Sequence, residues 1–148
     1  MDEPEVVRYL RESFEKQGWK VKWVSARKNH FERDIVAEKD VSKYIIQAKG
    51  DRPGQESYQI QYAIGEIVAE MREVGPEVHY GIAVPEGVAK RLWKFGLKGL
   101  KTLNLHLFVV TDYGGVYHLN PEKVFQFTES LRKYGEDNVY ASTFSTPP

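Results

Sequence analysis

Residues 34–49, DIVAEKDVSKYIIQAK, decide the fold of this chain. The stretch holds two runs rich in β-branched and aromatic residues, 34–39 and 43–49, with a turn at 40–42 between them. Side chains of a strand alternate between its two faces, so Gln47 and Lys49 point the same way. If the two strands pair antiparallel, Asp34 at the start of the first lies near the end of the second. The sequence thus predicts a carboxylate, an amide and an ammonium group where two strands finish.

The flanking segments extend this hairpin into a larger sheet. Upstream, helical spacing of apolar residues predicts a helix over 5–17, and alternation predicts a strand over 19–25. Downstream we expect a helix over 57–73, a strand over 79–84, a helix over 86–101, strands over 105–111 and 116–119, and a short helix after Pro121. The order predicts an α/β fold in which a mixed central sheet is flanked by helices, with an extra C-terminal β-hairpin.

Composition limits the classes of function. The 148 residues suffice for one domain, expected over 1–134, followed by a polar tail over 135–148 that is either frayed or ordered by a partner. Without cysteine there is no disulfide framework, thiolate zinc site or thiol nucleophile, and the four histidines lack the spacing of zinc ligands. An acidic N-terminus and the absence of a long apolar run predict a soluble, cytoplasmic protein with no membrane span.

The residues at the strand ends suit phosphodiester hydrolysis. Mg²⁺ (or Mn²⁺) prefers hard oxygen ligands, and Asp34 offers a carboxylate, Gln47 an amide oxygen and Ala48 a backbone carbonyl. A bound ion lowers the pKa of its water and screens the charge that builds on phosphate. Lys49 is placed to hold the attacking water and to stabilise that charge.

These residues and their strand context resemble the PD-(D/E)xK phosphodiesterase superfamily, the restriction-endonuclease-like fold. The tripeptide Gln47-Ala48-Lys49 is similar to the QxK form of Mrr-like endonucleases, and the opening helix followed by Gly18-Trp19 is similar to archaeal Holliday-junction resolvases. The resemblance covers about residues 5–110. It implies an αβββαβ core and Mg²⁺-dependent cleavage of DNA. Because glutamine replaces the second acid of the motif, it also implies a compensating glutamate on the first helix, with Glu5 the first candidate.

Several basic and polar residues are candidates for DNA contact. Arg27 and Lys28 precede Asp34, Gln59 opens the helix after the motif, and a stripe on the helix over 86–101 contains Lys90, Lys94 and Lys98. Each candidate also has a plainer interpretation. The lysines suit the solvated face of an amphipathic helix, and Gln59 suits helix-surface packing. Asp34 suits a loop cap, Gln47 and Lys49 an exposed edge strand, and Glu5 a helix-dipole acid.

Two classes of function are compatible with these residues. The first is a metal-dependent endonuclease acting on DNA, which would work as a homodimer if it cuts both strands, since one small domain holds one site. The alternative is a catalytically inactive nucleic-acid-binding or assembly module with the same fold. A balance of 21 basic and 21 acidic residues and the missing acid at position 47 favour this alternative. An ordinary α/β adaptor, with no spatial link between Asp34 and Lys49, is a third possibility.

Overall fold

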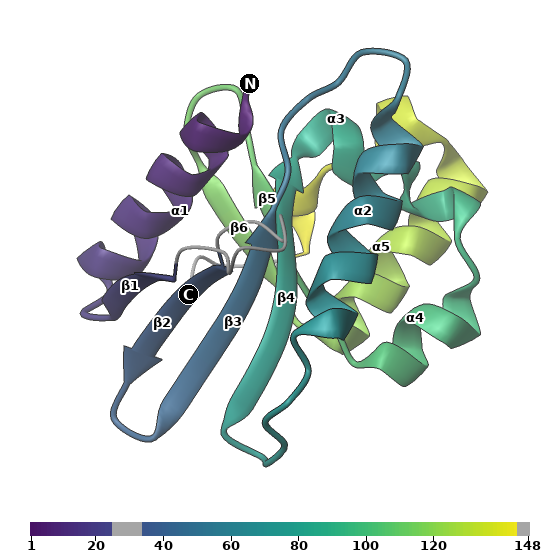
Figure 1. The fold of residues 1–148 in the computed structure, drawn as a ribbon. Helices are drawn as coiled ribbons and strands as arrows, with labels where there is room; N and C mark the ends of the chain where they lie inside the picture. Colours follow the sequence, from purple (N-terminus) through teal and green to yellow (C-terminus); the bar gives the residue numbers. More distant parts are fainter. Residues whose placement is uncertain (25–33, 145–148) are drawn as a thin grey trace.

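A computed structural model describes residues 1–24 and 34–144, and the side chains of Trp23, Val24 and Asp34 lie outside that description. Six strands form one sheet in the order β1-β2-β3-β4-β5-β6. Their bounds are β1 Lys20–Val24, β2 Asp34–Lys39, β3 Ser42–Ala48, β4 Val78–Pro85, β5 His106–Val110 and β6 Val116–Leu119. Strands β1, β2 and β3 are antiparallel, β3, β4 and β5 run parallel, and β5 and β6 form an antiparallel hairpin. The expected mixed sheet with its added hairpin is confirmed (Figure 1).

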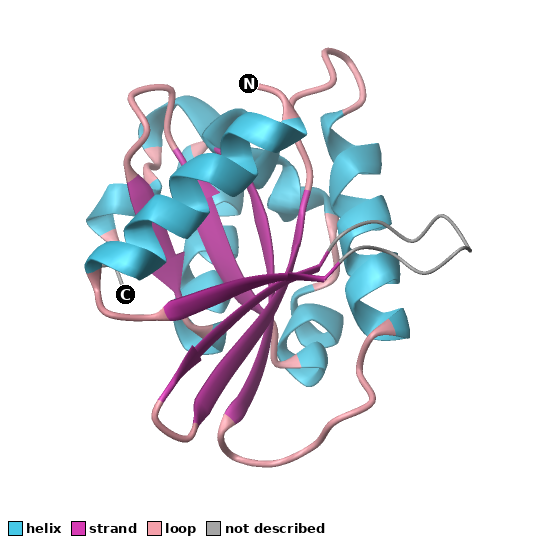
Figure 2. Cartoon of the chain, turned by 60° about the vertical axis from the view of Figure 1, so that its left-hand side comes forward, coloured by secondary structure: helices cyan, strands magenta, loops and turns pink. Residues whose placement is uncertain are grey.

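Helices cover both faces of the sheet, as Figures 1 and 2 show. Of the described helices, α1, Glu3–Lys16, is the one that packs on the first face, through Val6, Leu10 and Phe14. The other face is covered by α2 Glu56–Ala69, α3 Glu86–Ala89, the 3₁₀ helix η1 Lys90–Lys94, α4 Leu97–Leu103 and α5 Pro121–Tyr134. The order α1-β1-β2-β3-α2-β4 reproduces the expected αβββαβ core.

The strand β3 lies inside the sheet, between β2 and β4. Its second half is buried on both faces, and Ile45 and Ile46 contribute to the two separate apolar cores on either side of the sheet. The interpretation of Gln47 and Lys49 as the solvated face of an edge strand is therefore wrong. A near-continuous apolar run is what a strand covered on both faces requires.

The helix expected over 86–101 is broken into three pieces. Phe95 and Gly96 adopt extended backbone conformations between η1 and α4. The guanidinium of Arg132, from α5, donates hydrogen bonds to the backbone carbonyls of Trp93 and Phe95. Because the Arg132 side chain donates to these carbonyls, they keep hydrogen-bond partners although the helix ends there. Lys90, Lys94 and Lys98 consequently do not form one straight basic stripe.

The segment after α5 differs from the expected frayed or partner-ordered tail. Its described part forms two short 3₁₀ helices, η2 Glu136–Asn138 and η3 Ala141–Thr143. Val139 and Ala141 are buried in the core that α5 shares with α2. The two apolar residues anchor a polar segment that composition alone describes as a tail. Among the described residues, every helix is too short or too polar to cross a membrane.

Candidate functional site

The end of β3 carries a buried polar side chain. Gln47 is 1% exposed, and its backbone pairs with Ile82 of β4. Its amide nitrogen, Nε2, is buried and has no hydrogen-bond partner. Burying an unpaired amide in a central strand costs roughly 1–3 kcal/mol, so this group requires an explanation other than packing.

Lys49 lies two residues further on, where β3 has just ended. Its backbone N–H donates to the carbonyl of Ala83 at 3.0 Å, which extends the pairing with β4. Its Nζ lies 2.9 Å from Oε1 of Glu66 and 3.8 Å from Oε1 of Glu3, and its side chain is 12% exposed. Two carboxylates, one from the helix on each face of the sheet, therefore meet one ammonium group. The second oxygen of Glu66, Oε2, is buried without a hydrogen-bond partner.

A close approach of two backbones places Glu3 beside Lys49. A Cβ added to Gly50 would lie 2.5 Å from the backbone nitrogen of Glu3, so glycine is required where β3 leads out past the start of α1. Next to it, the N–H of Asp51 donates to the carbonyl of Met1 at 2.7 Å, and the Asp51 carboxylate pairs with the N-terminal ammonium at 2.7 Å. These contacts hold the first turn of α1 against the end of β3.

Gln59 fixes the same connection from the other side. Its Nε2 donates to the carbonyl of Gly50 at 2.8 Å, and only 8% of the residue is exposed. The expectation that Gln59 contacts nucleic acid is corrected by this geometry, because its donor is engaged inside the protein. The residue positions the β3–α2 connection instead.

Glu5, the expected first-helix metal ligand, lies in a helix cap. Its Oε2 accepts from the N–H of Asp2 at 3.0 Å, while the Asp2 carboxylate accepts from the N–H of Glu5 at 2.9 Å. This reciprocal pair is a capping box at the start of α1, and it corrects the assignment of Glu5 to the metal site. The acid of this helix that reaches Lys49 is Glu3.

Asp34 is placed by its backbone only. It begins β2 and pairs with Val24 of β1. Strand β2 pairs with β3 through Ile35 opposite Ile46, and continuing that register by one residue brings the backbone of Asp34 opposite Gln47. The expected proximity of these two positions is consistent with the register. Arg27 and Lys28 lie outside the described residues.

Sequence reasoning missed Glu3 and Glu66. Glu3 stands in the first turn of α1, where an acid is ordinary. Glu66 carries a weak signal: it interrupts the apolar run formed by Ile64, Ile67 and Val68, and it lies seven residues, or two helical turns, after Gln59. Its meeting with Lys49 depends on how α2 crosses the sheet, which no local pattern specifies.

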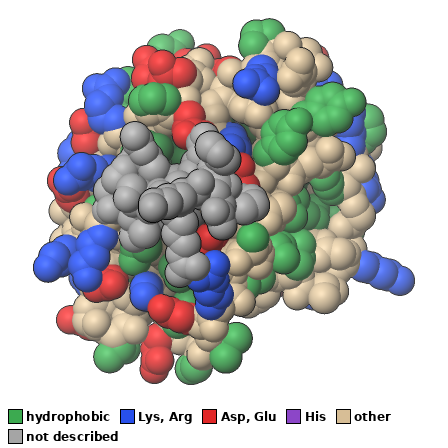
Figure 3. Space-filling model, viewed as in Figure 1, with side chains coloured by type: hydrophobic (Ala, Val, Ile, Leu, Met, Phe, Trp, Pro, Cys, Tyr) green, Lys and Arg blue, Asp and Glu red, His purple; other side chains and the backbone are tan. Residues whose placement is uncertain are grey.

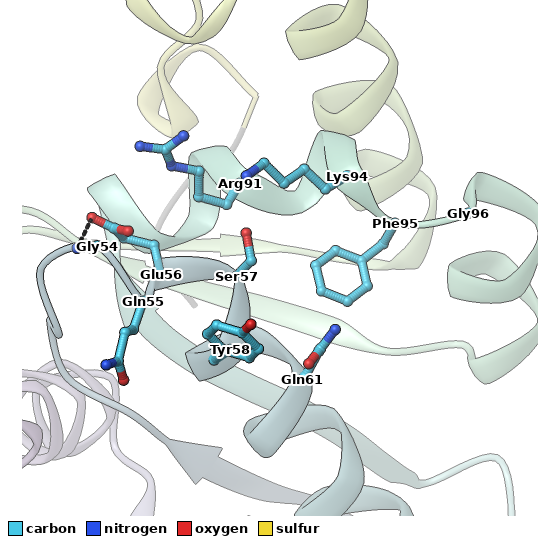
Figure 4. A pocket seen from close by; sticks show the side chains of 10 residues that line it. All are labelled: Gly54, Gln55, Glu56, Ser57, Tyr58, Gln61, Arg91, Lys94, Phe95 and Gly96. Atoms are coloured by element: carbon cyan, nitrogen blue, oxygen red, sulfur yellow. Dashed lines mark hydrogen bonds between the residues drawn. The ribbon is translucent and has the colours of Figure 1, made fainter.

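A hollow with a volume of about 600 Å³ lies between the start of α2 and η1. Arg91 and Lys94 line one side of it, and Ser57, Tyr58 and Gln61 line the other (Figure 4). Glu56 also lines it, and hydrogen bonds from backbone N–H groups, above all those of Glu56 and Gly54, lower the pKa of this carboxyl, with Arg91 and Lys94 adding to the effect. Of the expected DNA contacts, Lys94 is thus in a hollow. Lys98 is exposed on α4, and the Nζ of Lys90 stands 4.2 Å from the ring centre of Tyr140.

Charge is mixed over the visible surface. Figure 3 shows basic and acidic side chains intermingled on this face rather than gathered into one basic area, among the described residues. The equal totals of 21 basic and 21 acidic residues agree with this distribution. The charges therefore create no strong overall field of one sign on this face.

Three histidines that lie far apart in the sequence come together on the α1 face of the sheet. His106 Nδ1 and His118 Nε2 lie 2.8 Å apart, and the His79 ring is 5.1 Å from that of His106. His118 is therefore a hydrogen-bonded packing residue between neighbouring rings. Within the described part of the chain, no three His, Asp or Glu side chains are arranged to hold a metal ion.

Comparison with known proteins identifies relatives by fold only. No protein-family model matches the sequence, and no curated protein sequence matches it. Solved structures do match, among them an FdxN element excision controlling factor protein from Anabaena variabilis and an XisH family protein from Nostoc punctiforme. The first is 16% identical with a TM-score of 0.56, and the alignment covers 76% of this chain and 95% of that one. The second is 17% identical with a TM-score of 0.54, and covers 76% and 97%. The chain therefore has the mixed α/β fold of these excision-controlling and XisH family proteins.

Proposed function

We propose that the protein is a metal-dependent endonuclease that hydrolyses phosphodiester bonds in DNA. The observation that carries the proposal is the pairing of a buried, unsatisfied Gln47 with Lys49 at the end of a central strand, beside acids from two helices. A structural polar network would satisfy its own members, whereas this one leaves buried polar atoms open. Open polar groups at a strand end are what a bound ion and a phosphate would complete.

The residues present fit a hard divalent cation. The Nε2 of the Gln47 amide is buried without a hydrogen-bond partner, and a half-turn of the amide exchanges its oxygen with its nitrogen. Mg²⁺ or Mn²⁺ would be held by the Asp34 carboxylate, the Gln47 amide oxygen and the Ala48 carbonyl. When bound, such an ion supplies an acidified water and screens the negative charge of the phosphate.

Lys49 is the proposed catalytic residue of the chain itself. Its ammonium group is mostly shielded from solvent, where a charge acts more strongly than it does in water. It would orient the attacking water and stabilise the charge that develops on the phosphate oxygens. Glu66 and Glu3 hold the lysine nitrogen in place from opposite sides of the sheet.

DNA would also need basic side chains outside this site to hold its backbone. Arg91 and Lys94 at the hollow beside α2 are the proposed backbone contacts, with Lys90, Lys98, Arg27 and Lys28 as further candidates. Cleavage of both strands requires two such sites, so we propose a homodimer as the form that cuts duplex DNA.

The test is cleavage of a panel of labelled duplex, branched and single-stranded DNAs with Mg²⁺ or Mn²⁺. Wild type should cut at least one member, and Lys49→Ala should lose at least about 100-fold in rate, the lower range for removing a group that stabilises transition-state charge. Lys43→Ala is the matched control, because Lys43 lies near the start of β3, the strand that ends just before Lys49, and pairs with Glu73 at 3.0 Å. Wild-type rates in Lys49→Ala would refute the assignment.

One observation favours the alternative of an inactive module with the same fold. The Nζ of Lys49 already has a close carboxylate partner in Glu66, as a lysine with a purely structural role would. Under this alternative the protein binds DNA or assembles with other proteins without cutting, and no member of the panel is cleaved in either metal.

A further inference from the structure

We propose that Glu66 is a ligand of the catalytic ion and supplies the second carboxylate that Gln47 cannot. This inference rests on the proposed function, and it assigns a role to a residue on α2, outside the strand-end motif. Glu66 would keep Oε1 on Lys49 and present Oε2 to the ion.

The two oxygens of Glu66 have different surroundings. Oε1 lies 2.9 Å from the Lys49 nitrogen, whereas Oε2 is buried and accepts no hydrogen bond. An ionised carboxylate has about four acceptor positions, and burying one oxygen without a donor is costly. If Glu66 served only to neutralise Lys49, a more exposed side chain with its second oxygen in water would do so at lower cost.

Gln47 gives an independent indication of a missing partner. It is almost completely removed from solvent and lies on the same face of β3 as Lys49. Its unsatisfied Nε2 and the unsatisfied Oε2 of Glu66 therefore belong to two residues that flank the same lysine. With the Gln47 amide turned by half a turn, its oxygen and Oε2 of Glu66 would both be the hard oxygen ligands that a divalent ion prefers, and one ion would satisfy both residues.

The charge count agrees with this role. Mg²⁺ in phosphate chemistry is usually held by one or two carboxylates and several waters. Asp34 provides one, and position 47 provides none. Glu66 and Glu3 together place two negative charges against the single positive charge of Lys49, so this trio carries a net negative charge that a cation would offset. Glu3 is the less suitable ligand, because it is more exposed and lies 3.8 Å from the lysine.

The experiment measures Mn²⁺ binding to the full chain by calorimetry, with thermal unfolding in chelator as the check on folding. Glu66→Gln should weaken Mn²⁺ binding at least about 10-fold, the lower bound for losing an acid that supports a metal site. Glu129→Gln, the same change at an exposed position of α5, should bind as wild type does.

A second pair of variants separates a metal ligand from an ion-pair partner. Lys49→Met should bind Mn²⁺ at least as tightly as wild type, because a competing positive charge is gone. Lys49→Met combined with Glu66→Gln leaves neither member of the pair charged, so it should fold, yet its affinity should fall as far as that of Glu66→Gln.

Each outcome supports or overturns a specific claim. Unchanged Mn²⁺ affinity in Glu66→Gln, or in the double variant relative to Lys49→Met, overturns the role of Glu66 while leaving the nuclease proposal intact. Loss of cleavage in Glu66→Gln with unchanged Mn²⁺ affinity shows that the residue acts only through Lys49, which also overturns it. A wild-type protein that binds no Mn²⁺ at millimolar concentration overturns the proposed function itself.

Discussion

At the scale of single residues, the site is built by burial more than by charge. Lys49 and Glu66 are both largely shielded, at 12% and 17% side-chain exposure, and removing either partner leaves the other uncompensated. Lys43 and Glu73, at the far end of the same strand, are paired at a similar distance, but Glu73 is half exposed. Exposed ion pairs contribute little to stability. Loss of the Lys43–Glu73 pair should therefore destabilise the protein less than loss of the Lys49–Glu66 pair, although each pair joins a lysine to a glutamate.

The histidine pair gives a prediction about pH. Burial, followed by the charges of neighbouring groups, lowers the pKa of His106 to about 3 and that of His118 to about 4. His79 and Lys123 face the pair as potential positive charges, and the Tyr44 ring packs against it. Both rings therefore stay neutral in the folded protein at pH values where the unfolded chain takes up protons.

The free energy of unfolding should fall as the pH drops below about 6.5. The part of this fall that the two rings cause should end near their folded pKa values of about 4 and about 3. Each ring contributes a slope of about 1.4 kcal/mol per pH unit. In His118→Gln the unfolding free energy should change less steeply with pH between these limits, because the unfolded chain takes up about one proton fewer. Urea unfolding across that pH range measures the slope. Parallel profiles for variant and wild type would contradict the burial of these rings in neutral form.

At this scale the sequence pointed to some residues of the proposed site and not to others. Asp34, Gln47 and Lys49 were recognisable because strand alternation places residues from local order alone. Glu3 and Glu66 were not, since their meeting with Lys49 depends on where two helices lie relative to the sheet. The same limit explains the histidines, which appeared scattered because three different strands bring them together.

At the scale of elements, the contact between the start of α1 and the β3–α2 connection is the tightest part of the site. Gly50 makes it possible, because any side chain there would overlap the backbone of Asp2 and Glu3. Nothing in the local sequence gives a reason to place this connection against the N-terminus. The prediction of one long helix over 86–101 was wrong for a related reason. Arg132, which is distant in sequence, donates hydrogen bonds to the carbonyls where the helix stops.

Two glycine variants test this contact. Gly50→Ala should destabilise the protein by roughly 1–3 kcal/mol, because a Cβ 2.5 Å from the Glu3 nitrogen forces α1 or the connection to move. Gly99→Ala, in α4, meets no atom within 4 Å and should stabilise the protein by up to about 1 kcal/mol through helix propensity. Denaturant unfolding measures both. An equal effect of the two substitutions would show that α1 is not held against the connection as described.

At the scale of the whole molecule, the sheet topology could be predicted from the sequence, but the function of the protein could not be predicted from that topology. Three strands in succession pair as hairpins, and a strand–helix–strand unit crosses over to a parallel neighbour, so few sheets were possible. The likeness to XisH family structures extends over 76% of the chain and agrees with that topology. Fold alone does not assign an activity, so the proposed activity rests on a few side chains at the end of β3.

The most direct test of the central claim is the position of a metal ion. Crystals of the protein grown with Mn²⁺ should show anomalous density at the end of β3, with an Asp34 carboxylate oxygen, the Gln47 amide oxygen and the Ala48 carbonyl as ligands. Density at that place would establish the divalent-ion site from which the proposed cleavage follows. Well-ordered crystals saturated with Mn²⁺ that show no ion between these three residues would contradict it.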